Sequence, residues 1–193
     1  MPNQDSGVPS PAELAAAVGG LERSRDAVLA CCTGLSGDAW AHVDSPNDSS
    51  NDGAGRWTVA DILEHMLLFE TRYTAGLEES LRQPANPEWA AQTANKDAAT
   101  AQAAVVRTPL VAPATMQPRG GIAPAELLAQ WTAARAATIA LAVRPGQALK
   151  SHTHPHRILG TISAYQGLLF IAAHTDRHRL QIERCLAAAT PRS

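Results

Sequence analysis

The chain has 193 residues, of which 38 are alanine, 19 are leucine and only 8 are aromatic. This length suits a single hydrophobic core, and Ala and Leu lose little conformational freedom in a helix, so the composition argues against an all-β fold. With 16 basic and 18 acidic residues, the net charge of -2 offers no basic surface for nucleic acid or an anionic membrane.

No apolar run approaches the roughly 20 residues that a membrane span needs. The N-terminal residues MPNQDSG have neither the basic start nor the apolar segment of a signal peptide. We therefore expect a cytoplasmic protein without a membrane partner. Cys31, Cys32 and Cys185 are an odd number and do not make a disulfide framework, so we interpret them as buried or idle thiols.

Two helices are predicted in the first half of the chain, each from its own start signal. The sequence SPAE at Ser10–Glu13 combines a hydroxyl cap, a proline in the first turn and a glutamate that can close a capping box, which predicts a helix from about Pro11 to Thr33. Thr58 is the predicted cap of the second helix, Asp61 supplies a carboxylate to its first turn, where the helix dipole favours it, and its apolar positions continue to Pro84.

The segments around these helices are predicted to be connections. Gly34 can take the left-handed conformation that ends a helix, and the Asn, Asp, Gly and Ser residues of 44–55 predict a flexible loop. Five prolines lie between Pro84 and Gly121, although the Ala-rich residues 89–107 could form a weaker helix. A connection this long allows the next helix to run parallel to the second one.

Two further helices are predicted in the second half. One follows Pro124 and ends before Pro145, and the other starts near Arg157, because Pro155 disfavours helical conformation in His154. The last helix is expected to run to about residue 189. We therefore predict an all-α four-helix bundle domain over residues 10–190, with a long crossover between its second and third helices and a flexible N-terminus over residues 1–9.

Histidines occupy apolar faces of two predicted helices. His174 and His178 lie four residues apart, so both imidazoles project from one face of the last helix. His65 lies in the middle of the apolar face of the second helix. A single buried histidine is usually bonded to a carbonyl or carboxylate, but three together are most simply satisfied by a cation. Three ligands leave a fourth, open position, as in catalytic metal sites.

The motifs WTVADILEHMLLFE, HPHRILG and FIAAHTDRHRLQIE resemble the DinB-like (YfiT-type) metalloprotein superfamily over residues 11–186. The resemblance implies an up-down-down-up bundle, frequently a homodimer, with a divalent metal (Zn, Ni or Fe) held by His65, His174 and His178. It gives no ligand role to His154, and the roles of His152 and His156 are left open as well. Relatives include thiol-dependent S-transferases and a mycothiol-dependent maleylpyruvate isomerase, which implies a low-molecular-weight thiol as a further cofactor.

Three functions remain open from the sequence. The first is a thiol-dependent S-transferase or isomerase acting on a small-molecule substrate, the second a hydrolase that uses a metal-bound water with a carboxylate base, and the third a non-enzymatic metal-binding stress-response protein. Gln181, one turn beyond His178, is the candidate to orient a ligand, and Trp57 is interpreted as a packing anchor. The charged neighbours of the histidines are expected to face solvent or an adjacent helix: Glu64, Glu70, Asp176 and Arg177.

Overall fold

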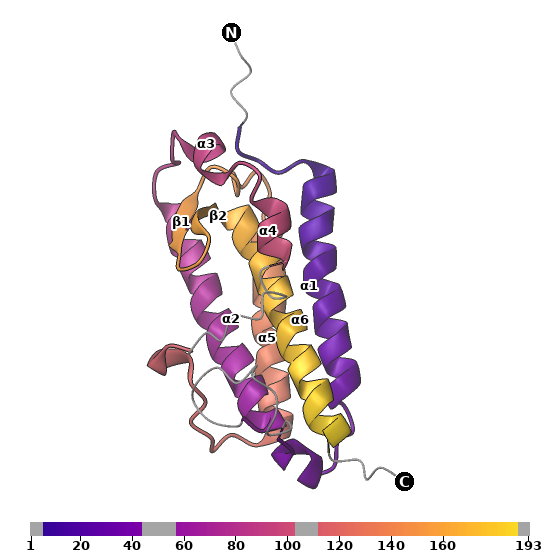
Figure 1. Cartoon of the computed structure of the whole chain (residues 1–193). Helices are drawn as coiled ribbons and strands as arrows, with labels where there is room; N and C mark the ends of the chain where they lie inside the picture. The colour runs from indigo at the N-terminus through magenta and orange to yellow at the C-terminus, as the bar shows by residue number, and fades with distance from the viewer. Residues whose placement is uncertain (1–5, 44–56, 103–111, 189–193) are drawn as a thin grey trace.

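The computed structural model describes residues 6–43, 57–102 and 112–188. Four long helices lie side by side (Figure 1): α1 (Pro11–Cys32), α2 (Val59–Arg82), α5 (Pro124–Ala142) and α6 (Ala164–Ala188). The short elements between them are η1 (Asp38–Ala41), α3 (Trp89–Thr93), α4 (Asp97–Gln102), η2 (Ala114–Met116) and the antiparallel strands β1 (Thr153–His156) and β2 (Gly160–Ser163). The predicted all-α class is confirmed, apart from the small hairpin. None of the helices within the described ranges is long and apolar enough to cross a membrane.

The start of α1 has the predicted capping box. Ser10 Oγ accepts the Glu13 N–H at 3.2 Å, and Glu13 Oε2 accepts the Ser10 N–H at 2.7 Å. Beyond the end of α1, Gly34 has a φ of +80°, the left-handed conformation predicted for it. The predicted loop at 44–55 lies outside the described residues.

Helix α2 begins with the same device. Thr58 Oγ1 accepts the Asp61 N–H at 3.1 Å, and Asp61 Oδ2 accepts the Thr58 N–H at 2.9 Å. This cap fixes the first turn of the helix that carries His65, so it sets where that imidazole enters the core.

Replacing Thr58 with Ala is expected to lower the free energy of unfolding by about 1 kcal/mol, because the Asp61 N–H loses its acceptor in the first turn of α2. Thr71→Ala is the matched control, since it makes the same change at an exposed position within α2 and is expected to be neutral or slightly stabilising. Urea denaturation of both variants measures the difference. Equal stability of the two variants would show that the cap contributes nothing.

The predicted start of the last helix is wrong. Residues around Arg157 form the turn of the hairpin, in which Thr153 pairs with Ser163, and α6 begins only at Ala164. The hairpin is held by Lys96, whose Nζ donates to the carbonyls of two of its residues, Leu159 and Thr161. Such a distant contact is not visible in the local sequence.

A local signal for the true start of α6 was nevertheless present. Ser163 Oγ accepts the Gln166 N–H, and Gln166 Oε1 accepts the Ser163 N–H, both at 3.1 Å. This Ser-x-x-Gln pattern is a capping box, and it marks the helix start seven residues after the predicted position.

The crossover between α2 and α5 contains two short helices instead of one weak helix over residues 89–107. Helices α3 and α4 are separated by Asn95, which has a φ of +60° and cannot continue a right-handed helix. Helix α4 packs on α6. Residues 103–107 lie outside the described ranges.

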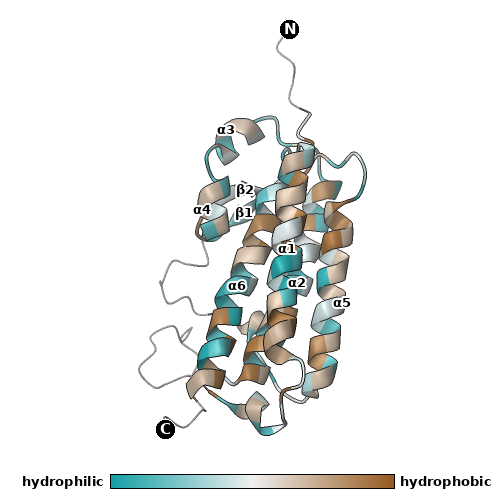
Figure 2. Cartoon of the chain, turned by 90° about the vertical axis from the view of Figure 1, so that its right-hand side faces the viewer, coloured by the Kyte–Doolittle hydropathy of each residue, from teal (hydrophilic) through white to brown (hydrophobic). Residues whose placement is uncertain are grey.

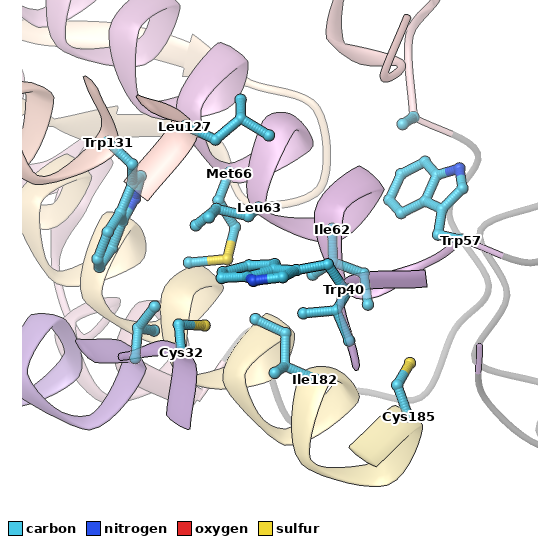
Figure 3. Close-up of a cluster of buried hydrophobic side chains, with 13 residues drawn as sticks. Cys32, Trp40, Trp57, Ile62, Leu63, Met66, Leu127, Trp131, Ile182 and Cys185 are labelled. Atoms are coloured by element: carbon cyan, nitrogen blue, oxygen red, sulfur yellow. The ribbon is translucent and has the colours of Figure 1, made fainter. Parts of the chain in front are cut away.

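The described part of the chain has two hydrophobic clusters in its core. One is built from residues at the end of the molecule near η1, including Val28, Trp40, Ile62, Met66, Trp131 and Ile182 (Figure 3). The other lies toward the hairpin and includes Leu21, Leu77, Leu141, Tyr165 and Leu168. Figure 2 shows a hydrophilic stretch in the middle of α6, between these two regions.

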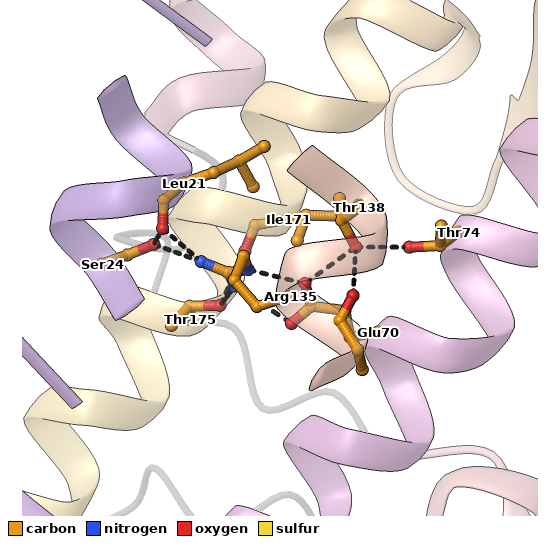
Figure 4. Close-up of polar contacts among 9 residues, drawn as sticks. Leu21, Ser24, Glu70, Thr74, Arg135, Thr138, Ile171 and Thr175 are labelled. Carbon is orange, nitrogen blue, oxygen red and sulfur yellow. Dashed lines mark hydrogen bonds and ion pairs between the residues drawn. The ribbon is translucent and has the colours of Figure 1, made fainter. Parts of the chain in front are cut away.

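A buried ion pair lies between the two clusters (Figure 4). Arg135 on α5 is fully buried, and its Nε and Nη2 donate to the two carboxylate oxygens of Glu70 on α2 at 2.6 and 3.0 Å. Its remaining donors reach the Leu21 carbonyl at 2.6 Å, Ser24 Oγ at 2.8 Å and Thr175 Oγ1 at 2.6 Å. One guanidinium therefore connects all four long helices.

Candidate metal centre

Three histidines from two helices converge beside the buried Arg135–Glu70 ion pair and its hydrogen-bonding partners. The potential ligand nitrogens of His65 on α2 and of His174 and His178 on α6 all lie within 4.8 Å of one another. The Nε2 atoms of His65 and His174 are 3.3 Å apart. Among the described residues, these three form the one His, Cys, Asp and Glu group with a geometry that could hold a metal ion.

The outer ring nitrogens of two of the histidines are fixed by acceptors. His65 Nδ1 lies 2.7 Å from the carbonyl oxygen of Met116, and His178 Nδ1 lies 2.9 Å from Gln181 Oε1. An acceptor at Nδ1 places the ring proton on that nitrogen. The Nε2 of each ring therefore keeps a lone pair, which points away from the acceptor. Histidine ligands of metals commonly have such partners on their outer nitrogen.

The environment keeps the three imidazoles neutral. Burial lowers the pKa of His65, and it lowers the pKa of His174 and His178 well below the usual value, with a further contribution from the neighbouring imidazoles. Neutral imidazole is the form that binds a metal. The donor set therefore fits a divalent ion such as Zn, Ni or Fe, all of which accept imidazole nitrogen.

Aromatic rings enclose most of the three-histidine group. The Trp57 ring centroid lies 4.8 Å from that of His65, and Phe69 stacks on His174 at 3.7 Å. Trp57 is buried, so it packs as the predicted anchor (Figure 3). His65 and His178 are also buried, whereas His174 is half-buried, so the His174 side is the least buried part of the group.

Sequence reasoning missed the Met116 carbonyl and the residue that places it. Glu64 is buried, and its two oxygens accept the backbone N–H groups of Arg119 and Gly120 at 3.0 and 2.9 Å. This contact holds the segment after η2 against α2, near the carbonyl that His65 meets. The adjacent Gly120 and Gly121, with φ of +73° and +91°, were a local hint of a tight turn at this point.

The remaining predicted residues lie outside the three-histidine group. Glu70 belongs to the buried ion pair, while Asp176 is exposed and pairs with Arg179 at 3.8 Å. Arg177 is half-buried. His152, just before the hairpin, has another partner, since its Nδ1 contacts the Ala148 carbonyl at 3.0 Å.

The helical fold and this histidine group define the chain as a helical protein with a candidate metal centre. A family model described as the DinB superfamily matches residues 20–182. The chain belongs to the DinB superfamily, which confirms the resemblance seen in its motifs. No curated protein and no solved structure matches it.

Replacing Gln181 with Leu is expected to weaken zinc binding by about 10–100-fold, because His178 loses the acceptor that orients its ring. Gln181→Glu keeps an acceptor and should retain most of the affinity. The exposed Gln130→Leu is the control for the same change elsewhere. Competition with a chromogenic chelator measures the affinities, and an unchanged value for the Leu variant would argue against this role.

Proposed function

We propose that the protein is a metal-dependent enzyme that joins a low-molecular-weight thiol to an electrophile or uses the thiol in an isomerisation. His65, His174 and His178 would hold the ion, with Gln181 and the Met116 carbonyl orienting two of the rings. The observation that carries the proposal is the convergence of three neutral imidazoles in a group that is least buried at His174. Three protein ligands leave a position for an exogenous ligand.

A bound divalent ion would supply the positive charge that favours the thiolate form of a thiol at neutral pH. The protein residues would exclude water around it, because Trp57 and Phe69 cover two of the three rings. The half-buried His174 marks the side from which thiol and electrophile would enter. In a transfer reaction the thiolate sulfur forms a bond to the electrophilic carbon, and the leaving group departs with the bonding electron pair.

The neighbouring carboxylates give less support to hydrolysis. Hydrolysis in the form considered above needs a carboxylate as general base. Glu64 is engaged by two backbone N–H groups, Glu70 by Arg135, and the exposed Asp176 by Arg179. We therefore rank the thiol-dependent reaction first and keep hydrolysis and a non-enzymatic metal-binding role as alternatives.

Turnover by metal-loaded protein is the test. Glutathione, cysteine and other cellular thiols are each combined with a panel of electrophiles, and the rates are compared with those of His174→Ala. Thiol-dependent turnover above this control is the expected result. Turnover without added thiol would favour hydrolysis, and no turnover above the control would contradict the proposal.

We further propose the up-down-down-up order of the bundle. It is supported by the order in which each helix contributes to the two hydrophobic clusters: α1 and α6 pass from the hairpin cluster to the η1 cluster, whereas α2 and α5 pass in the opposite direction. The homodimer and the cytoplasmic location remain predictions. Size-exclusion chromatography with light scattering would test the dimer.

A further inference from the structure

A continuous series of aromatic rings leads away from His174, the least buried member of the three-histidine group. We call His174, Phe170, Tyr73, His156 and His154 the aromatic strip; all five side chains are half-buried. Ring centroids along the strip are 6.1 Å apart for Phe170 and His174, 4.4 Å for His156 and Phe170, and 5.5 Å for Tyr73 and His154. The strip thus joins the candidate metal centre to the hairpin.

The hairpin end of the strip carries hydrogen-bonding atoms for which the described residues supply no partner. His156 Nδ1 accepts the N–H groups of Ile158 and Leu159 at 3.3 and 3.2 Å, so the ring proton is on Nε2. Nε2 is therefore a donor. His154 Nε2 lies 3.0 Å from the Tyr73 hydroxyl, while its Nδ1 is buried and has no hydrogen-bond partner among the described residues.

These groups are uncharged at neutral pH. Burial, together with the neighbouring His156, lowers the pKa of His154 to about 4, and burial lowers the pKa of His156 and raises that of Tyr73. The nearby Lys96 ammonium is already bonded to the carbonyls of Leu159 and Thr161. Neutral donors do not offset the cost of removing a carboxylate from water, so this end of the strip favours an uncharged acceptor.

We propose that the aromatic strip binds the substrate of the enzyme and that this substrate is an uncharged, planar molecule with a conjugated carbonyl group. Its flat part would stack on Phe170 and Tyr73, and its carbonyl oxygen would accept from His156 Nε2. The identification of this ligand as the electrophile rests on the proposed thiol-dependent function, whereas the binding site itself does not. With such an electrophile the thiolate sulfur would form a bond to the β-carbon as the carbon–carbon π bond breaks, and the proton given up by the thiol would end on the α-carbon, so no leaving group is needed. The position beside His174 would bring the ligand next to the candidate metal centre.

Calorimetry with zinc-loaded protein in the absence of thiol tests the binding site. The probes are benzylideneacetone, a neutral aromatic enone, and cinnamate, an anion of nearly the same shape. We expect the enone to bind at least 10-fold more tightly than cinnamate. Equal or tighter binding of cinnamate, or no measurable binding of the enone, would overturn the proposal.

Two variants locate the enone on the strip. His156→Asn can keep an acceptor for the turn N–H groups but removes the Nε2 donor, and it should weaken enone binding at least 5-fold. His152→Asn is the matched control on the same segment, outside the strip, and should bind like the wild type. Phe170→Leu removes the stacking surface without touching the hairpin hydrogen bonds, and it should also weaken binding. Zinc content confirms that each variant is folded.

These results separate the two proposals. Strip-dependent enone binding without thiol-dependent turnover would support the site and contradict the thiol chemistry. Thiol-dependent turnover with enone binding unchanged in both His156→Asn and Phe170→Leu would overturn the site alone.

Discussion

Replacing Arg135 with Met is expected to lower the free energy of unfolding by about 3–5 kcal/mol, the cost of leaving one partner of a buried ion pair without the other. Arg135 is fully buried and Glu70 is almost so. Removal of the guanidinium leaves the Glu70 carboxylate with fewer donors, and the Leu21 carbonyl keeps the Ser24 hydroxyl but loses the charged donor. Urea denaturation monitored by circular dichroism measures the loss.

The structure provides a matched control in an exposed ion pair. Arg144, just after the end of α5, pairs with Glu78 on α2 at 2.7 Å, but Arg144 is half exposed, so Arg144→Met should cost no more than about 1 kcal/mol. The double variant Glu70→Leu with Arg135→Met should be less destabilised than the sum of the two single variants, because no unpaired charge remains. Similar losses for Arg135→Met and Arg144→Met would contradict this explanation.

Replacing His178 with Ala is expected to abolish tight zinc binding. His178 supplies one of three imidazoles from a buried position, and two remaining ligands cannot close the site. Loss of an outer hydrogen-bond partner alone costs about 10–100-fold in affinity, so loss of a ligand should cost more than about 100-fold. Metal analysis of protein purified without an affinity tag, followed by chelator competition, measures the change.

The same variant shows whether the ion also clamps α2 to α6. A ligand present at 100 times its dissociation constant stabilises the folded state by about 2.7 kcal/mol. The wild type should therefore melt at a lower temperature after addition of a chelator, whereas His178→Ala should not respond. His152→Ala, which changes a histidine outside the three-histidine group, should behave like the wild type. Full zinc binding by His178→Ala would remove this residue from the site.

The sequence alone determined the helical class, the starts of α1 and α2, and the three histidines of the candidate centre. Each of these rests on residues close together in the chain: the caps join residues three positions apart, and His174 and His178 are one helical turn apart. His65 could be added because it interrupts the apolar face of α2. The start of α6 was predicted wrongly, although the capping box at Ser163 was available as a local signal.

Only the tertiary structure decided which hydrogen-bond partners the buried polar side chains have. Arg135 bonds to residues 40 to 114 positions away, and the carbonyl that meets His65 lies 51 positions from it. The same is true of the aromatic strip, where Tyr73 contacts His154 across 81 positions. Local patterns report backbone preference and which face of a helix is apolar, whereas the pairing of buried polar groups depends on how helices distant in sequence pack together.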